Sequence, residues 1–213
     1  MITKYVFWFF PAITGVVSVC YAHQGRGRIF LKLTVSGSVL LLLAGYALYT
    51  GKGPEFPFVW GLSFALAASM VGDFFLSSGD DTFLHGVGGF FFAHAGYLSA
   101  FLMLGGFNLP ALGVFSLVLL LYLLLVLRPK IEDKVLFWAV CGYTAISALV
   151  IAAAFGTRQP LFVLGALLIA LSDCIIAWNK FVRPVRYDEV LILSTYYLAQ
   201  ISIGIGSWVL ISA

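Results

Sequence analysis

Three ionisable side chains stand inside long apolar stretches of this sequence: Asp73, His94 and Asp173. An ionisable group within a membrane-spanning helix costs roughly 2.5–3.5 kcal/mol on insertion scales, so each of these residues needs a physical reason. Two carboxyl groups away from water can divide the roles of acid and base, because desolvation and like charge favour the protonated form of one of them. The three residues are therefore candidates for acid–base chemistry.

A metal centre is a weaker interpretation of the same residues. Two aspartates and one histidine could hold a metal ion, but membrane hydrolases that use zinc need several histidine ligands, and only His94 lies in an apolar stretch. Cys20, Cys141 and Cys174 also lie in apolar stretches, at unrelated spacings. We therefore expect no metal and no cofactor.

The elements that must position these residues are membrane-spanning helices. Hydrophobic residues make up 62% of the 213 positions and charged residues 10%, with a mean hydropathy of +1.05, whereas about a quarter of the residues in a soluble domain are charged. The apolar runs are long and do not alternate, which favours helices over strands. The sequence predicts an all-α, polytopic membrane helix bundle, one transmembrane domain over residues 1–213, with helices at 5–22, 29–49, 56–77, 83–104, 110–127, 135–155, 160–178 and 190–211.

The two aspartates are expected at the same depth in the membrane. Asp73 lies about four residues, or ~6 Å, before the end of the third predicted helix, and Asp173 about five residues before the end of the seventh. The third and seventh helices cross the membrane in the same direction. The simplest arrangement is a polar chamber near one membrane face, lined by the third, fourth, seventh and eighth helices.

Polar side chains on the neighbouring helices are candidates for substrate binding. His94 and Tyr97 are three residues apart and therefore share one helical face. Each candidate also has a structural explanation, such as a hydrogen bond that ties two helices together, and either aspartate could be such a tether. The candidates for binding substrate or water are His94, Tyr97, Tyr197, Ser172 and Thr195.

The positive charges predict the orientation. We expect the first apolar stretch to be retained as a helix, because no clear cleavage site follows it. Successive connections between the predicted helices alternate between the two sides of the membrane. The side with the even-numbered connections and both termini carries only Lys4, Lys52 and Arg158. The rule that positive loops stay inside then places both termini outside and the chamber toward the cytoplasmic side, in a bacterial cytoplasmic membrane. Because the net charge of +3 arises in loops, we expect no nucleic-acid partner. The odd-numbered connections hold Arg26, Arg28, Lys32, Arg128, Lys130, Lys134, Lys180, Arg183 and Arg186.

A weak internal repeat suggests two parallel four-helix halves. Asp73 and Asp173 are 100 residues apart, and Tyr97-Leu98 recurs at Tyr197-Leu198 with the same offset. Such repeats are common in transporters. A small proton- or cation-coupled transporter therefore stays open as an alternative function, and so does a lipid-binding structural protein in which the acids only join helices.

Three short blocks resemble the YhhN-like lysoplasmalogenase family of integral membrane hydrolases. They are Val71-Gly72-Asp73-Phe74-Phe75-Leu76, then Phe91-Phe92-Ala93-His94-Ala95-Gly96-Tyr97, and then Gly165-Ala166-Leu167 followed by Ser172-Asp173. With the eight-helix layout, their order extends the resemblance over nearly the whole chain. The resemblance implies hydrolysis of the vinyl-ether bond of lysoplasmalogens, which are alkenyl-glycerophosphocholines or -ethanolamines, to a fatty aldehyde and a glycerophospho head group. It also implies that Asp73 and Asp173 are the catalytic pair.

The chemistry of a vinyl ether suits these residues independently. Proton delivery to the β-carbon produces an oxocarbenium ion, water captures it as a hemiacetal, and the hemiacetal collapses to aldehyde and alcohol. Such a reaction needs a protonated acid, a carboxylate that steadies the cation and guides water, and an apolar tunnel for the chain; glycosidases use two carboxyl groups in the same way. Which aspartate is the acid stays open at this point.

Overall fold

The computed structural model describes residues 7–23, 29–51, 53 and 55–212. Of the charges used above to predict orientation, Lys4, Arg26, Arg28 and Lys52 lie outside the described residues. All regular structure in the described part is helical. The long helices are α1 (Phe9–His23), α2 (Ile29–Thr50), α3 (Phe58–Ser78), α4 (Phe83–Leu104), α5 (Leu109–Leu121), α6 (Lys134–Gly156), α7 (Pro160–Phe181) and α8 (Asp188–Ser212).

The predicted polytopic helix bundle is confirmed. With the short turns that extend them, α2 to α8 include seven spans long and apolar enough to cross a membrane, whereas α1 has 15 residues and is shorter than the predicted first span. The chain is therefore an integral membrane protein. The short turns are η2 (Asp80–Thr82), which precedes α4, and η3 (Tyr122–Leu127) and η4 (Arg128–Lys130), which follow α5; η3 has the wider π-helical geometry.

The helix ends follow local sequence signals. The Asn108 side chain accepts a hydrogen bond from the Ala111 amide at the start of α5, and Asp133 does the same for the Leu136 amide at the start of α6. Pro160 occupies the first position of α7, where a missing N–H costs nothing. Gly79 separates α3 from η2 with a φ of 132°, which a residue with a side chain rarely adopts.

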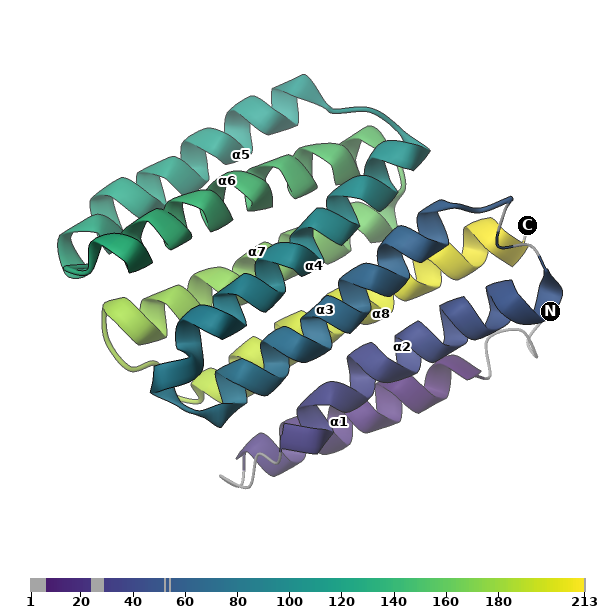
Figure 1. Ribbon diagram of the computed structural model, residues 1–213, viewed down its shortest axis with the longest axis horizontal. Coiled ribbons are helices and arrows are strands. Elements are labelled where there is room, and N and C mark those ends of the chain that lie inside the picture. The colour runs from purple at the N-terminus through teal and green to yellow at the C-terminus, as the bar shows by residue number, and fades with distance from the viewer. Residues whose placement is uncertain (1–6, 24–28, 52, 54, 213) are drawn as a thin grey trace.

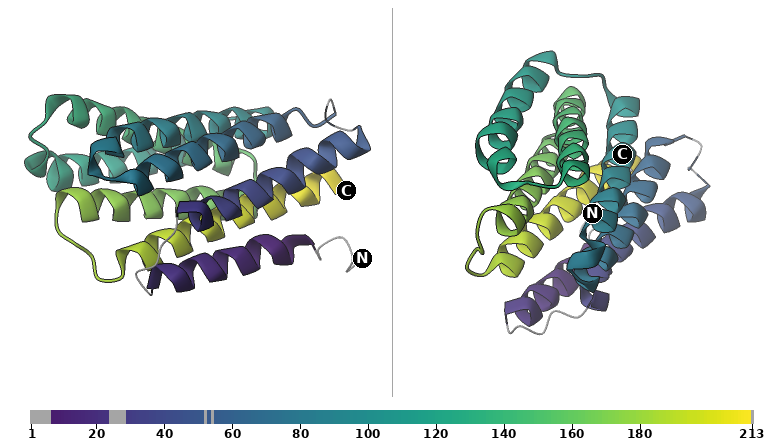
Figure 2. Two further views of the ribbon diagram at one scale, coloured as in Figure 1. Left: turned by 60° about the horizontal axis from the view of Figure 1, so that its bottom comes forward. Right: turned by 60° about the vertical axis from the view of Figure 1, so that its left-hand side comes forward.

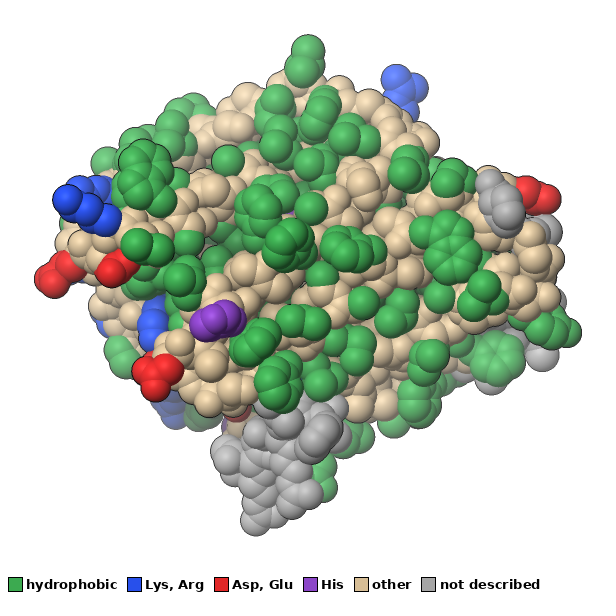
Figure 3. Space-filling view, in the orientation of Figure 1, with side chains coloured by type: hydrophobic (Ala, Val, Ile, Leu, Met, Phe, Trp, Pro, Cys, Tyr) green, Lys and Arg blue, Asp and Glu red, His purple; other side chains and the backbone are tan. Residues whose placement is uncertain are grey.

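Successive helices run in opposite directions, so the first turn of α1 and the last turn of α8 lie at the same end of the bundle (Figure 1). The pairs α1–α2 and α5–α6 occupy opposite sides, with α3, α4, α7 and α8 between them (Figure 2). Hydrophobic side chains cover the face shown in Figure 3, and the charged ones gather toward its two ends. The four central helices are those predicted to line a polar chamber.

The closest helix pair is α3 with α4, and small residues make the approach possible. A Cβ at Gly96 would lie 2.8 Å from the backbone nitrogen of Ala65, and one at Gly89 would lie 2.7 Å from the nitrogen of Gly72. Backbones that approach this closely leave no room for side chains at the contact, as is common where helices pair in membranes. This contact fixes α3, which carries Asp73, against α4, which carries His94.

Some helix contacts made by the first half of the chain, α1 to α4, have equivalents in the second half, α5 to α8. The pair α3–α4 is matched by α7–α8, and the contact of α2 with α8 is matched by that of α6 with α4. The outer helices differ, because α1 packs on α2 and α8 whereas α5 packs chiefly on α6. The internal duplication stays a prediction.

The α3–α4 contact generates a first testable prediction. Gly96→Ala should destabilise the protein by roughly 1–3 kcal/mol, because the added methyl group collides with the backbone of Ala65. The measurement is the thermal unfolding of purified protein in detergent. Gly88→Ala on the same helix is the matched control, since a Cβ there meets nothing within 4 Å. Equal stability of the two variants would contradict the close contact.

Candidate active site

A cavity of about 410 Å³ lies among the ends of α2, α3, α4, α7 and α8, and both intramembrane aspartates line it. Asp73 comes from α3 and Asp173 from α7, so two acids 100 residues apart in sequence border one space. Four charged residues, Lys32, Asp80, Lys180 and Glu189, also line it, and we call them the charged mouth. The cavity therefore combines two carboxyl groups deep in the bundle with a charged opening.

Asp73 is held by a tyrosine from the last helix. Its side chain is 7% exposed, and its Oδ2 accepts a hydrogen bond of 3.0 Å from the Tyr196 hydroxyl of α8. The Tyr196 hydroxyl lies 3.4 Å from the Ser36 hydroxyl of α2, which donates to Gln200 Oε1 at 2.8 Å. Because buried polar groups need partners, this chain of contacts ties α2, α3 and α8 together around Asp73.

Asp173 is held by side chains from two other helices. Its Oδ2 accepts a hydrogen bond of 2.9 Å from the Tyr143 hydroxyl of α6, and it lies 3.5 Å from His94 Nε2 of α4. The Asp173 side chain is 18% exposed, whereas that of His94 is 2% exposed. Asp173 is thus the more accessible carboxyl group of the pair, and a histidine lies directly behind it.

The hydrogen bonds of His94 define where its proton lies. Its Nδ1 is 2.9 Å from the Phe90 carbonyl oxygen, which can only accept, so Nδ1 carries a hydrogen. In the neutral ring Nε2 then presents a lone pair toward Asp173 Oδ2. Two lone pairs that face each other in a buried place repel, and protonation of either group relieves this repulsion. This pair can store a proton.

A second, narrower cavity adjoins the first and is almost entirely apolar. It lies among α3 to α7 and the π-helical turn η3, whose Tyr122 hydroxyl donates to the Cys174 carbonyl at 2.8 Å. Asp173 lines both cavities. The two cavities also share Leu76, Phe83, Phe90 and Ile176. A carboxyl group therefore lies at the junction of a space with a charged mouth and a space lined by hydrocarbon.

The charged mouth is arranged as two ion pairs. Lys32 Nζ lies 3.0 Å from Glu189 Oε1, and Lys180 Nζ lies 2.7 Å from Asp80 Oδ1. Both pairs are partly open to solvent, so each contributes little to stability. They place two positive and two negative side chains at the opening of the cavity.

The structure brings together some of the predicted binding residues and not others. His94 adjoins Asp173, and Ser172 lines the cavity while its hydroxyl donates to the Ile192 carbonyl. Tyr97 is buried and is not among the residues that line this cavity. Tyr197 and Thr195 are not part of the wall described for this cavity. Their roles, and those of the two aspartates, stay predictions.

The contacts of Tyr197 and Thr195 explain why they lie elsewhere. The Tyr197 hydroxyl donates to the Lys32 carbonyl at 3.2 Å and contacts the Ser18 hydroxyl at 2.9 Å, so it joins α8 to α1 and α2. The Thr195 hydroxyl donates to carbonyls of its own helix, those of Leu191 and Ile192. Both residues serve helix packing in this structure.

The sequence analysis did not single out Tyr143, whose hydroxyl donates to Asp173, or Tyr196, whose hydroxyl donates to Asp73; its candidate on α8 was the neighbouring Tyr197. Successive residues of a helix point about 100° apart, so a shift of one position exchanges the cavity side for the α1–α2 side. The signal for Tyr143 was a cluster of polar residues inside a predicted span, with Thr144 and Ser147 next to it. The sequence could not show that this face of α6 meets α4 and α7.

Within the described residues, no three His, Cys, Asp or Glu side chains gather as a metal-binding group. The polar groups next to the two aspartates are hydroxyl groups and one imidazole. The arrangement can donate a proton, accept a proton and orient a hydroxylic ligand.

Comparison with known proteins identifies a family that matches most of this chain. A profile of the YhhN family matches residues 31–207. Lysoplasmalogenase TMEM86B from Homo sapiens is 33% identical over 171 residues, which cover 79% of this chain and 71% of that protein. The Sus scrofa protein of the same name is 36% identical over 145 residues, 67% of this chain and 61% of that protein. Lysoplasmalogenase TMEM86A from Bos taurus is 32% identical over 162 residues, and the chain spans 62% of its length. No solved structure matches.

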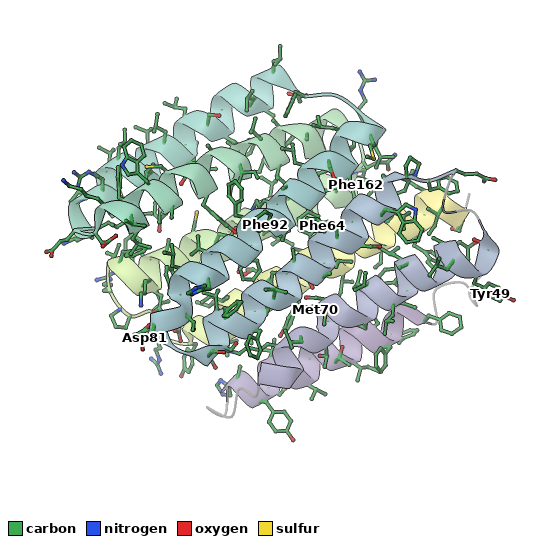
Figure 4. The ribbon with its side chains drawn as sticks, viewed as in Figure 1. Tyr49, Phe64, Met70, Asp81, Phe92 and Phe162 are labelled. Atoms are coloured by element: carbon green, nitrogen blue, oxygen red, sulfur yellow. The ribbon has the colours of Figure 1, made fainter. Side chains whose placement is uncertain are left out.

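The hydrogen bond to Asp73 generates a second prediction. Tyr196→Phe should destabilise the protein by about 1–3 kcal/mol, because a buried carboxyl group loses its donor. Tyr49→Phe is the matched control, since Tyr49 is 90% exposed at the edge of the bundle (Figure 4). Thermal unfolding in detergent measures both variants, and a Tyr196→Phe protein as stable as the control would refute the assignment.

Proposed function

The chain belongs to the YhhN family, and from this premise we propose that it is a lysoplasmalogenase that hydrolyses the vinyl-ether bond of lysoplasmalogens. The products are a fatty aldehyde and glycerophosphocholine or glycerophosphoethanolamine. The observation that carries the proposal is the place of Asp173, at the junction of a charged cavity and an apolar one, with Asp73 on the wall of the charged cavity.

The two cavities suit the two ends of the substrate. A lysoplasmalogen has a zwitterionic head group at one end and a long alkenyl chain at the other, with the vinyl-ether bond at the joint. With the head group toward Lys32 and Lys180 and the first carbons of the chain in the apolar cavity of about 80 Å³, the scissile bond lies beside Asp173. Binding sites of this kind combine an apolar lining with a few placed polar groups.

Asp173 is the proton donor in this proposal. The proton that it shares with His94 passes to the β-carbon of the vinyl ether, which leaves Asp173 as a carboxylate and the substrate as an oxocarbenium ion. The new negative charge lies next to the new positive charge, and the Tyr143 hydroxyl keeps its hydrogen bond to Asp173. Preorganised groups that match developing charge are the usual source of large rate enhancements.

Asp73 is the base. Its Oδ2 accepts a hydrogen bond from Tyr196, and Lys32 lines the same cavity. Water attacks the oxocarbenium carbon and loses a proton to Asp73, which gives the hemiacetal. The hemiacetal hydroxyl then gives its proton to the Asp173 carboxylate as the carbon–oxygen bond to glycerol breaks. The protonated Asp73 gives its proton to the glycerol oxygen, the aldehyde leaves, and both aspartates return to their starting states.

Product analysis tests the reaction. Purified protein should release fatty aldehyde from alkenyl lysolipids and leave ester lysolipids intact, because only the vinyl ether forms an oxocarbenium ion on protonation of carbon. Asp73→Asn and Asp173→Asn should each lower the rate by about 10²- to 10⁴-fold, the range for loss of a general acid or base. Aldehyde release is followed by mass spectrometry.

The control for these variants is Asp81→Asn, the same chemical change on the exposed turn after α3 (Figure 4). It should keep wild-type turnover. Wild-type protein that releases no aldehyde would refute the proposed activity, and near-normal turnover in either Asp73→Asn or Asp173→Asn would refute the shared acid–base mechanism.

We also propose that the charged mouth opens toward the cytoplasmic side of a bacterial cytoplasmic membrane, with both termini outside. The described charges support this, because Lys130 and Arg186 lie in connections at the mouth end and Lys180 in the last turn of α7 at that end, whereas Arg158 lies in a connection at the other end.

Cysteine labelling in intact cells tests the orientation. In a background without the three native cysteines, Glu55→Cys should react with a membrane-impermeant thiol reagent added outside. Lys130→Cys should react only after permeabilisation. Both positions are exposed and lie at opposite ends of the bundle. The reverse labelling pattern would overturn the orientation.

A further inference from the structure

Two buried hydroxyl groups behind Asp73 lack hydrogen-bond partners among the described residues. They belong to Ser69 of α3, which is 1% exposed, and Tyr97 of α4, which is 2% exposed. The two hydroxyls are close enough to interact electrostatically, but neither makes a hydrogen bond of ordinary distance and angle. Buried polar groups in proteins nearly always have a partner, in the protein or in ordered water. Two unpartnered buried hydroxyls at one place therefore indicate that a small molecule binds between them.

The surroundings of this pair place it beside the reacting groups. Ser69 precedes Asp73 by four residues on α3, so both side chains lie on one face of the helix. The Ser69 hydroxyl also neighbours that of Tyr196, which donates to Asp73. Tyr97 lies within electrostatic range of both Asp73 and Asp173. Asp73 and Tyr196 line the cavity, and Ser69 and Tyr97 adjoin them in the buried interior of the bundle.

The chemistry of the border identifies the ligand. Hydroxyl groups both donate and accept, so Ser69 and Tyr97 suit a small neutral partner that also does both. A buried water typically makes two to four hydrogen bonds to polar groups of this kind. An ion would find no compensating charge in Ser69 and Tyr97 themselves.

We propose that Ser69 and Tyr97 hold the hydrolytic water against Asp73, ready to attack the oxocarbenium carbon. The inference rests on the proposed vinyl-ether hydrolysis and adds the water site that this reaction requires. As the water oxygen bonds to the carbon, one of its protons passes to the Asp73 carboxylate, and Ser69 and Tyr97 stay in place as positioning residues. Proton delivery by Asp173 does not depend on them.

Because Asp173 delivers the proton and Ser69 and Tyr97 position the water, a loss of water positioning can be detected by running the reaction in heavy water. In the wild-type protein, Asp173 delivers deuterium to the β-carbon and water captures the cation at once, so recovered substrate stays unlabelled. Without a positioned water the cation lasts long enough for rotation about its Cα–Cβ single bond, so that the original proton of the β-carbon, in place of the deuteron, faces the Asp173 carboxylate and returns to it. That return restores the vinyl ether with deuterium in place of hydrogen at the β-carbon.

The variants are Tyr97→Phe and Ser69→Ala, assayed as full-length purified protein in detergent. We expect kcat to fall roughly tenfold to a hundredfold with KM within about twofold, the size of one hydrogen bond to a charged or reacting group. Recovered substrate should carry deuterium at the β-carbon. The melting temperature should not fall, because the hydroxyls removed have no protein partner. Ser63→Ala is the matched control, an unpartnered hydroxyl on the same helix away from the aspartates.

Unchanged kcat in both variants, an equal loss in Ser63→Ala, or a loss of kcat with unlabelled recovered substrate would each overturn the water site. A structure of the wild-type protein at a resolution that shows water gives a readout independent of activity. It should contain a water within hydrogen-bond distance of Ser69 Oγ and Tyr97 Oη, and a direct hydrogen bond between the two side chains would refute the proposal. Failure of the proposed function is a separate result, the absence of aldehyde from wild-type protein.

Discussion

The structure depends on the burial of two carboxyl groups inside a helix bundle that contains few other charges. A carboxyl group at this depth is tolerated only where other helices bring it donors, because lipid and apolar side chains supply none. Asp73 receives the Tyr196 hydroxyl of α8, and Asp173 receives the Tyr143 hydroxyl of α6. These bonds require α3 to meet α8 and α7 to meet α6 at defined heights. The acids therefore constrain the order and register of the helices as much as the helices position the acids.

The two acids have unequal surroundings, on which the proposed division of roles rests. Asp173 faces an imidazole whose other nitrogen is committed to the Phe90 carbonyl, so the pair can hold a mobile proton. Asp73 is nearly closed to solvent and is approached by hydroxyl donors. Glycosidases separate acid and base between two carboxyl groups through the same kind of difference in environment. Here the difference arises from which helix of the other half packs against each aspartate, α4 for one and α8 for the other.

The two adjoining cavities relate the site to the bilayer. In the proposed reaction, a lipid with one chain must bring its vinyl-ether bond to the two aspartates without exposing the chain to water or the head group to hydrocarbon. Asp173 at the junction of the charged and apolar cavities meets this requirement. The π-helical turn η3 adds Tyr122 and Leu127 to the apolar lining, next to the lipid-facing helix α5. π-Helical turns often occur at functional sites.

The sequence by itself determined the class of fold and the identity of the acids. Long apolar runs must be helices in a membrane, so the eight helices and most of their ends could be read from composition and from Gly, Pro and cap residues. Buried acids are rare enough to identify Asp73 and Asp173. Only the tertiary structure decided which hydroxyls meet them. Whether Tyr196 or Tyr197 faces the cavity depends on about 100° of rotation of α8, and whether Tyr143 reaches Asp173 depends on how α6 packs against α4 and α7. Helices that are apolar on every side carry no periodic signal of their orientation, so packing alone sets these rotations.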